Sequence, residues 1–148
     1  MSAPSDPYTL IERFPGIDDF RRLRAVAGLS PKAQQAAERG LPNTLYGVSI
    51  LHDGHAIGMG RIIGDGGLCF VVVDIAVEPE HQGRGLGKRI MAALDAWLKA
   101  NTLDTAHVSL IADGEAKHLY AQYGFADVGP ASVGMHYLVR RNAMPPIP

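Results

Sequence analysis

The sequence predicts an α/β fold of the α+β kind, in which a mixed, mostly antiparallel central sheet is flanked by helices. Two β-rich runs in the middle of the chain are separated by Asp53-Gly54, a dipeptide that favours a tight hairpin. An apolar strand, a helix and a further strand follow, and a crossover of this kind joins parallel strands. With 148 residues, 47% of them hydrophobic, the chain is expected to form one domain over 1–148 with a loose tail at about 142–148.

Charge and apolar patterning narrow the class of partner. The 14 basic residues against 15 acidic ones leave a net charge of -1, which provides no basic field for nucleic acid. The longest apolar run, Leu68 to Val73, has six residues, far short of the ~20 that span a bilayer. The polar start over 1–7 lacks the features of a secretory signal, and the lone Cys69 agrees with a reducing compartment. We therefore expect a cytoplasmic protein that binds neither nucleic acid nor membrane.

The first third of the chain is expected to hold a short strand and two helices. The strand spans Tyr8 to Glu12, and Asp18-Asp19 cap a helix that ends near Ala27. The apolar stripe of this helix is expected to hold Phe20, Leu23 and Val26. Three arginines are expected to lie largely off this stripe: Arg21, Arg22 and Arg24. They are expected to form a solvated face or, as the alternative, to bind a carboxylate of a ligand. Ser30-Pro31 predicts the start of a second short helix, which Gly40 ends.

Three strands are predicted in the middle. Thr44 to Leu51 and His55 to Ile63 form the hairpin. The glycine-rich stretch 64–67 turns the chain into a third strand over 68–77, whose nearly continuous apolarity suits a central strand buried on both faces. Within it, Cys69 is expected to be a small buried apolar residue.

The last third predicts a crossover and two further elements. A helix is expected from Gly85 to about Ala100, and a strand over His107 to Ile111 should lie parallel to the central one. Asp113 or its neighbour is expected to cap a helix that ends at Tyr123 before Gly124. Met135 to Val139 is expected to supply a last strand, which includes His136.

The turn before the crossover helix carries the strongest chemical signal. Gly83, Gly85 and Gly87 free the backbone to approach a ligand, and the amides at the helix start have no intrahelical partners. Such a turn can hold an anion. Cations at a helix start cost roughly 0.3–1 kcal/mol each, so the presence there of Arg84, Lys88 and Arg89 favours a bound polyanion over an empty turn. The spacing fits neither the dinucleotide fingerprint nor the Walker loop.

The residues from Asp74 to Lys88 resemble motif A of the GNAT superfamily of acyl-CoA-dependent N-acetyltransferases. The Q/R-x-x-G-x-G/A core of that motif is present as Gln82, Gly85 and Gly87. The stretch 113–125 resembles the family's N-x-x-A-x-x-x-Y…G-F segment, so the resemblance covers roughly residues 44–140. It implies a sheet splayed between the central strand and the strand after the crossover helix, with acetyl-CoA as co-substrate in the gap.

The resemblance also implies a contact for each part of acetyl-CoA. Its pyrophosphate would lie on the amides of Arg84 to Lys88, and its pantetheine would pair with the main chain of Ile75 to Val77. The expected cofactor contacts are Ile75, Ala76, Val77, Gln82, Gly83, Arg84, Gly85, Leu86, Gly87, Lys88, Asp113, Ala116 and Tyr120. Asp113 replaces the usual Asn, and because a carboxylate cannot donate, only the accepting half of that contact is expected.

Acetyl transfer to an amine needs an acid for the thiolate and a route for the amine proton. An alkylamine with a pKa near ~10.4 is mostly protonated at pH 7, so a base or a water chain must remove its proton. Tyr120 is the expected acid, because the family often places its acid there. Packing is the alternative role for Tyr120, and Tyr123 is the second candidate acid, although it is expected to pack beside Phe125.

Two carboxylates are candidates for the base. Asp74 interrupts an apolar strand, where an ionisable group is costly unless it is paired or used. A structural role, bonded to backbone or to an arginine such as Arg61, is the equal alternative. Glu78 lies on the same strand face and could act through water.

These residues lead to two hypotheses for function. The first is an N-acetyltransferase that moves an acetyl group from acetyl-CoA directly to a primary amine of a small molecule or peptide in a ternary complex. The second is a non-catalytic acyl-CoA-binding or sensing module on the same fold. The six histidines show no metal-binding spacing, so no metal is expected. A homodimer is plausible from the family resemblance.

Overall fold

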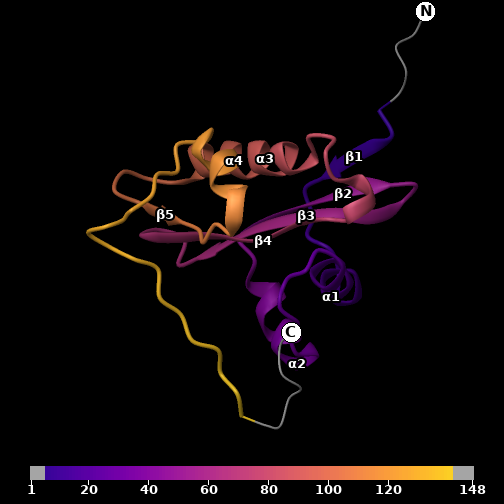
Figure 1. Ribbon diagram of the computed structural model, residues 1–148, viewed down its shortest axis with the longest axis horizontal. Helices are drawn as coiled ribbons and strands as arrows, with labels where there is room; N and C mark the ends of the chain where they lie inside the picture. The colour runs from indigo at the N-terminus through magenta and orange to yellow at the C-terminus, as the bar shows by residue number, and fades with distance from the viewer. Residues whose placement is uncertain (1–5, 142–148) are drawn as a thin grey trace, which may run out of the picture.

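Residues 6–141 of the protein, which the computed structural model describes, form a five-stranded sheet with helices on both faces (Figure 1). The strands lie in sequence order: β1 (Tyr8–Ile11), β2 (Tyr46–His52), β3 (His55–Gly64), β4 (Cys69–Val77) and β5 (His107–Ser109). The first four strands pair antiparallel, and β5 is parallel to β4. The expected mixed, mostly antiparallel sheet is confirmed, whereas the tail expected at about 142–148 lies outside the described residues.

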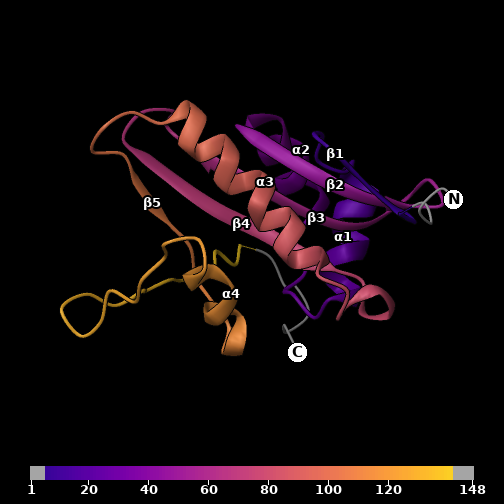
Figure 2. The same cartoon turned by 90° about the horizontal axis from the view of Figure 1, so that it is seen from above.

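The helices are divided between the two faces. α1 (Ile17–Val26) and α2 (Gln34–Gly40) lie on one face, and α3 (Leu86–Asn101) crosses the other, with α4 (Lys117–Ala121) on the same side (Figures 1 and 2). Short 3-10 turns span Leu41–Asn43, Pro79–His81 and Gly114–Ala116. None of the helices within 6–141 combines the length and the apolar character needed to cross a membrane.

Two apolar cores attach these helices to the sheet. Ile50, Phe70 and Ile90 are fully buried between the sheet and α3, while Phe20 and Leu23 anchor α1 on the opposite face. Full burial of one such side chain stabilises a fold by roughly 1.5–3 kcal/mol. The elements around the candidate site are therefore fixed by packing on both sides of the sheet.

A bulge interrupts β4 at Asp74. Met59 pairs with Ala76 and Arg61 with Val73, so three steps along β4 match two along β3. Asp74 has a φ of 61°, a left-handed conformation that is uncommon outside glycine and typical of strained backbone. The extra residue changes which side chains face each helix layer, since Phe70 packs in the α3 core and Ala76 in the α1 core.

The sheet splays from residue 72 of β4 onward. β5 pairs only with Cys69, Phe70 and Val71 at the start of β4. The rest of β4, residues 72–77, has no strand partner on that side among residues 6–141. The expected gap between the central strand and the strand after the crossover helix is confirmed.

Local turn and crossover predictions are also confirmed. Asp53 and Gly54 have φ values of 50° and 78°, the pair of positive angles that a type I′ hairpin turn requires. Helix α3 begins at Leu86 with Gly85 as its N-cap, and the chain then returns to β5 parallel to β4.

Two helix starts were predicted wrongly. Gly16 is the N-cap of α1, and Asp18 and Asp19 lie in its first turn, where carboxylates stabilise the helix dipole without capping it. α2 begins at Gln34 rather than at Ser30-Pro31. Instead of capping a helix, Ser30 accepts hydrogen bonds from the Arg24 guanidinium through both its carbonyl oxygen and its hydroxyl.

The predicted C-terminal elements are shorter or absent. Asp113 is the N-cap of a 3-10 turn, and α4 ends at Ala121 rather than Tyr123. The strand predicted at Met135 to Val139, which includes His136, does not form, and within the described chain this stretch is exposed and belongs to no sheet. Local strand propensity is insufficient there because no neighbouring strand pairs with the segment.

Burial was predicted wrongly at three positions. Arg24 is 8% exposed and Val26 is 45% exposed, so the arginine takes the place on the buried stripe that was expected for the valine. Cys69 is the first residue of β4, and both it and its partner His107, the first residue of β5, are exposed. β4 is therefore not buried on both faces along its whole length.

Candidate active site

A groove opens where β4 and β5 diverge. It has a volume of about 380 Å³. Its lining comes from the end of β4, the glycine-rich turn, the start of α4 and the loop after α1: Ala27, Leu29, Ile75, Ala76, Val77, Gln82, Gly83, Gly85, Leu86, Gly87, Ala116, Leu119 and Tyr120. Most of the expected cofactor contacts therefore meet at one place. Arg84 and Lys88 lie next to lining residues in sequence and Asp113 lies three residues before Ala116, but none of the three lines the groove itself.

The turn presents unobstructed backbone to this groove. Gly83 and Gly85 have φ values of 76° and 78°, which glycine adopts at little cost. A Cβ added at either position would meet nothing within 4 Å, so the space above the turn is open. Gly85 is the N-cap of α3 without any side-chain cap, and the first amides of a helix have no intrahelical acceptors. This geometry suits a phosphate-bearing ligand.

Hydrogen bonds hold the turn in place from two directions. The Gln82 side-chain amide donates to the Val77 carbonyl oxygen at 2.9 Å, which ties the turn to the end of β4. The Tyr123 hydroxyl donates to the Lys88 carbonyl oxygen at 3.1 Å, which ties the segment after α4 to the first turn of α3. Arg89 pairs with Asp6 at 2.9 Å, so this guanidinium has a protein carboxylate as partner.

Tyr120 is the only titratable residue among those that line the groove in the described chain. The pKa of the Tyr120 hydroxyl is raised, mainly by burial and to a smaller extent by the negative charge of Asp113. Its ring contacts Phe125 edge-on, with centroids 6.4 Å apart. Tyr123 and Phe125 both pack against the same apolar core as Tyr120. A phenol with a raised pKa is protonated at neutral pH and can donate a proton.

Asp74 lies in the bulge of β4 and is not one of the groove residues. Its Oδ1 accepts from Arg24 at 2.6 Å and its Oδ2 from Arg61 at 2.6 Å. The Asp74 side chain is 7% exposed, and the two arginine side chains are 9% and 13% exposed. Arg61 also donates to Thr44 Oγ1 at 3.0 Å. Both carboxylate oxygens accept hydrogen bonds from arginines, which agrees with the alternative prediction that Asp74 has a structural role.

Glu78 faces a second pocket of about 350 Å³ near the β2–β3 hairpin tip. The residues lining it are Asp19, Arg22, His52, Asp53, His55, Ile57, Glu78 and His81. Glu78 forms an ion pair with Arg22, which also donates to the Ala56 carbonyl oxygen at 2.7 Å. The structure therefore separates the two candidate bases from the groove, Asp74 beneath the sheet and Glu78 in this pocket.

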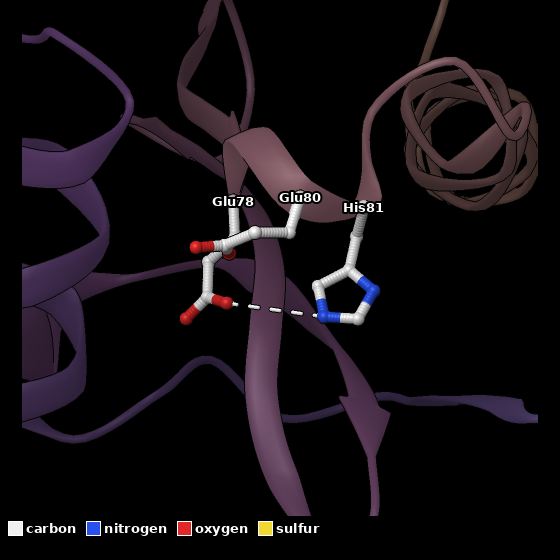
Figure 3. A group of neighbouring side chains, drawn as sticks. All are labelled: Glu78, Glu80 and His81. Carbon is white, nitrogen blue, oxygen red and sulfur yellow. Dashed lines mark ion pairs between the residues drawn. The ribbon is translucent and has the colours of Figure 1, made fainter.

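Glu78, Glu80 and His81 place potential metal-ligand atoms within 4.8 Å of one another (Figure 3). Figure 3 shows the Glu78 carboxylate facing His81 Nε2, at 4.0 Å. The other ring nitrogen of His81 is 2.7 Å from the Tyr8 hydroxyl. Because the Arg22 guanidinium already neutralises Glu78, a cation would have to compete for that carboxylate.

The arginines of α1 are what the sequence reasoning missed. They were expected on a solvated face, yet Arg24 is buried on Asp74 and Arg22 pairs with Glu78. Arg24 lies four residues after Phe20, a helical spacing that places both on one face and could have revealed it. Ala27 and Leu29, which line the groove, carry no comparable signal.

A family model described as an acetyltransferase (GNAT) domain matches residues 45–127. The chain therefore belongs to the GNAT acetyltransferase family. This confirms the family and the fold that the resemblance implied. Acetyltransferases of this family use acetyl-CoA.

Solved structures and curated relatives agree with this membership. A probable acetyltransferase from meticillin-resistant Staphylococcus aureus is 42% identical, with a TM-score of 0.85, over 89% of this chain and 99% of that one. A predicted acetyltransferase from Clostridium acetobutylicum, crystallised with acetyl-CoA, shares the fold at 16% identity and a TM-score of 0.63, over 86% of this chain and 96% of that one. Serotonin N-acetyltransferase 2, chloroplastic, from Oryza sativa subsp. japonica is 34% identical over 60% of this chain and 44% of its own length. The chain spans between 26% and 66% of the length of three curated relatives that it matches.

Proposed function

We propose that this GNAT protein transfers an acetyl group from acetyl-CoA directly to a primary amine of a small molecule or peptide in a ternary complex. The observation that carries the proposal is the groove between β4 and the start of α4, whose floor at Gly83 and Gly85 is open backbone at a helix N-terminus. The amides there suit a pyrophosphate, and the unpaired edge of β4 at Ile75 to Val77 suits the amide groups of pantetheine.

Each end of the co-substrate would meet a different part of the chain. The amides of Arg84 to Lys88 would hold the pyrophosphate, with Gln82 fixing the turn through Val77. Ala116 and Tyr120 line the groove on the α4 side, where the pantetheine arm would end. The bound thioester would supply the activated acetyl group.

Tyr120 would protonate the departing thiolate sulfur. Tyr120 lines the groove, and the raised pKa of its hydroxyl keeps the proton available at neutral pH. We assign Asp74 to holding the bulge, because both its oxygens are bonded to arginines. A base role for Glu78 would run through water, since this carboxylate lines the second pocket.

One observation favours the second candidate, a non-catalytic acyl-CoA-binding module. The described residues that line the groove include Tyr120 but no carboxylate or imidazole that could serve directly as a base. The two candidates therefore differ in whether water can carry the amine proton out of the groove.

The test is product formation from acetyl-CoA and a panel of amines, followed by free thiol release and by the mass of the acetylated amine. Acetylation of at least one amine, with loss of turnover in Tyr120→Phe, supports the enzyme. Binding of acetyl-CoA without transfer to any amine in the panel supports the binding module instead. If acetyl-CoA produces no thermal shift at millimolar concentration, both candidates fail, because a ligand at 100 times its Kd should stabilise by about 2.7 kcal/mol.

Further features of the proposal come from the sequence and, for the homodimer, from the family resemblance. We propose a cytoplasmic protein of one domain that acts as a homodimer. The lone cysteine and the absence of an excess of basic charge support a cytoplasmic enzyme for small or peptidic amines.

A further inference from the structure

The groove is lined from both sides of the sheet. Leu119 and Tyr120 come from α4, whereas Ala27 and Leu29 come from the segment directly after α1. α1 and α4 lie on opposite sides of the sheet (Figure 1). With the pantetheine ending on the α4 side, as proposed above, the acceptor would approach from the α1 side.

The same binding mode brings the acetyl group close to an excess of positive charge. With the pyrophosphate on the turn and the pantetheine paired along residues 77 to 75, the thioester would lie beyond Ile75, next to Asp74 in the bulge. Asp74 binds both Arg24 and Arg61, each at 2.6 Å. Two arginines on one carboxylate leave one positive charge uncompensated beside the place of transfer.

The segment between α1 and α2 brings a third cation, Lys32, to this place. The segment folds back along α1, because Arg24 donates to the Ser30 carbonyl oxygen at 2.9 Å and Arg21 donates to the Lys32 carbonyl oxygen at 3.2 Å. Leu29, three residues before Lys32, lines the groove. The backbone of Lys32 is therefore held between the groove and the buried ion pairs of Asp74.

The Lys32 ammonium lacks an anionic partner. It forms no hydrogen bond or ion pair with any residue in the range 6–141, although the residue is half-buried. The pKa of Lys32 is lowered, mainly by burial and then by the charge of Arg24, which together with Arg140 outweighs the opposing charge of Asp74. A bound anion would supply the missing negative charge and stabilise the ammonium.

We propose that the acceptor amine carries an anionic group, and that the Lys32 ammonium binds this group on the α1 side of the groove. Arg24 and Arg61 are committed to Asp74, and their side chains are only 9% and 13% exposed. The ligand carboxylate that the sequence suggested for the arginines of α1 would thus lie on Lys32 instead.

This inference rests on the proposed function and narrows its acceptor to primary amines that carry a carboxylate or a phosphate. The transfer itself is the one proposed above. The amine nitrogen bonds to the acetyl carbonyl carbon and the carbon–sulfur bond breaks, while the amine loses one proton and the thiolate sulfur gains one.

The experiment compares pairs of amines that differ by a negative charge. Glycine, β-alanine and 4-aminobutyrate are each paired with the corresponding carboxamide, and O-phosphoethanolamine is paired with ethanolamine. The readout is the ratio of kcat/KM for the charged amine to kcat/KM for its neutral partner, measured by thiol release. We expect a ratio above about 10 in at least one pair, the size of effect that one hydrogen bond to a charged group produces. The carboxylate and phosphate pairs show which anion is preferred.

Three variants test whether Lys32 is responsible for the preference. In Lys32→Gln the ratio should fall about 10- to 100-fold, mainly through KM, whereas Lys32→Arg should keep most of it. Lys99→Gln is the matched control, because the Lys99 side chain is 76% exposed and pairs with Asp95 on α3, across the sheet from α1. Circular dichroism would verify that each variant is folded.

The outcomes separate this inference from the proposed function. A ratio near one in every pair, or a ratio that Lys32→Gln leaves unchanged, overturns the inference while acetyl transfer stands. If none of these amines is acetylated, calorimetric titration of the CoA-loaded protein with each anionic amine decides instead. Binding that weakens in Lys32→Gln supports the inference, and absence of binding overturns it. Acetyl transfer itself fails only if no amine of the wider panel is acetylated.

Discussion

Arg24 and Asp74 form an ion pair of 2.6 Å beneath the bulge of β4, between side chains that are 9% and 7% exposed. Arg61 bonds the other oxygen of the same carboxylate, also at 2.6 Å. The pair connects α1 to the bulge of β4, where the alternation of side chains between the two faces of the sheet shifts by one residue. Because residues 75–77 follow directly, the position of the groove wall depends on this buried network.

Replacing Asp74 should therefore act mainly on stability. Asp74→Ala would leave two largely buried guanidinium groups without their carboxylate, and breaking a buried pair in this way costs about 3–5 kcal/mol. We expect a loss of this size in the free energy of unfolding, measured by urea denaturation with circular dichroism. A comparable fall in the affinity for CoA should follow in the folded fraction, because the bulge positions the groove wall.

The matched control is Asp95→Ala, which removes a carboxylate from the i,i+4 pair with Lys99 on α3. The Lys99 side chain is 76% exposed, so solvent screens the interaction and a loss of only about 0.3–0.5 kcal/mol is expected. Equal losses for the two variants would contradict the structural role of Asp74.

Tyr120→Phe should reduce turnover without weakening the binding of acetyl-CoA. Removing a general acid typically costs 10²–10⁴-fold in rate, and we expect a fall of about this size in kcat. Because burial raises the pKa of Tyr120, the hydroxyl stays protonated beyond the ordinary tyrosine pKa of ~10, and activity should decline only above that pH. Steady-state kinetics across pH would measure both effects.

Tyr123→Phe serves as the comparison. It removes the hydrogen bond to the Lys88 carbonyl oxygen and should cost about 1 kcal/mol in unfolding free energy. If Tyr123→Phe abolishes turnover while Tyr120→Phe does not, the acid has been assigned to the wrong tyrosine.

Local signals in the sequence were sufficient for the turns and for α3. The Asp53-Gly54 hairpin and the helix that starts after Gly85 depend on residues close together in the chain, where glycine conformation and helix spacing decide the outcome. The parallel pairing of β5 with β4 could also be predicted, because a strand, a helix and a further strand in succession form a crossover, which joins parallel strands. Of these elements, α3 contributes Leu86 and Gly87 to the groove lining, next to Gly85 at its N-cap.

Non-local features could not be read in the same way. The bulge at Asp74 is a matter of register between β3 and β4, and no residue spacing within β4 records it. The buried state of Arg24 depends on Asp74, 50 positions away. For the stretch 135–139 the error is of the opposite kind, because the local sequence favours a strand but no other strand in the described protomer pairs with it.

Two glycines of the turn should respond oppositely to alanine. Gly85 has a φ of 78°, and a left-handed conformation costs an L residue roughly 1–2 kcal/mol, so Gly85→Ala should destabilise by that amount. Gly87 lies within α3, where a Cβ would meet only Leu119 Cδ2 at 3.6 Å, an ordinary contact. Alanine is the better helix former, so Gly87→Ala should stabilise the free protein by up to ~1 kcal/mol.

Thermal unfolding without ligand would compare the two glycine variants, and a CoA titration would follow on the same samples. Gly85→Ala should also weaken CoA binding, because its backbone strain falls on the amides at the start of α3. A stabilising Gly85→Ala would show that the turn does not need the left-handed conformation.

Asp65 should make the β3–β4 turn sensitive to acid. Its Oδ1 accepts from the backbone amides of Gly67, Leu68 and Cys69 at 2.8–3.0 Å, and these bonds lower its pKa below the ordinary value of 3.8. A carboxylate with a depressed pKa in the folded state contributes stability above its unfolded pKa and loses it as the pH falls through the folded one. Asp65→Ala should therefore melt at a lower temperature than the parent at pH 6, and the difference should shrink progressively below about pH 3.8. Scanning calorimetry of both proteins between pH 2.5 and pH 6 would measure it, and a difference that does not change with pH would show that the three amide bonds do not depend on the charge of Asp65.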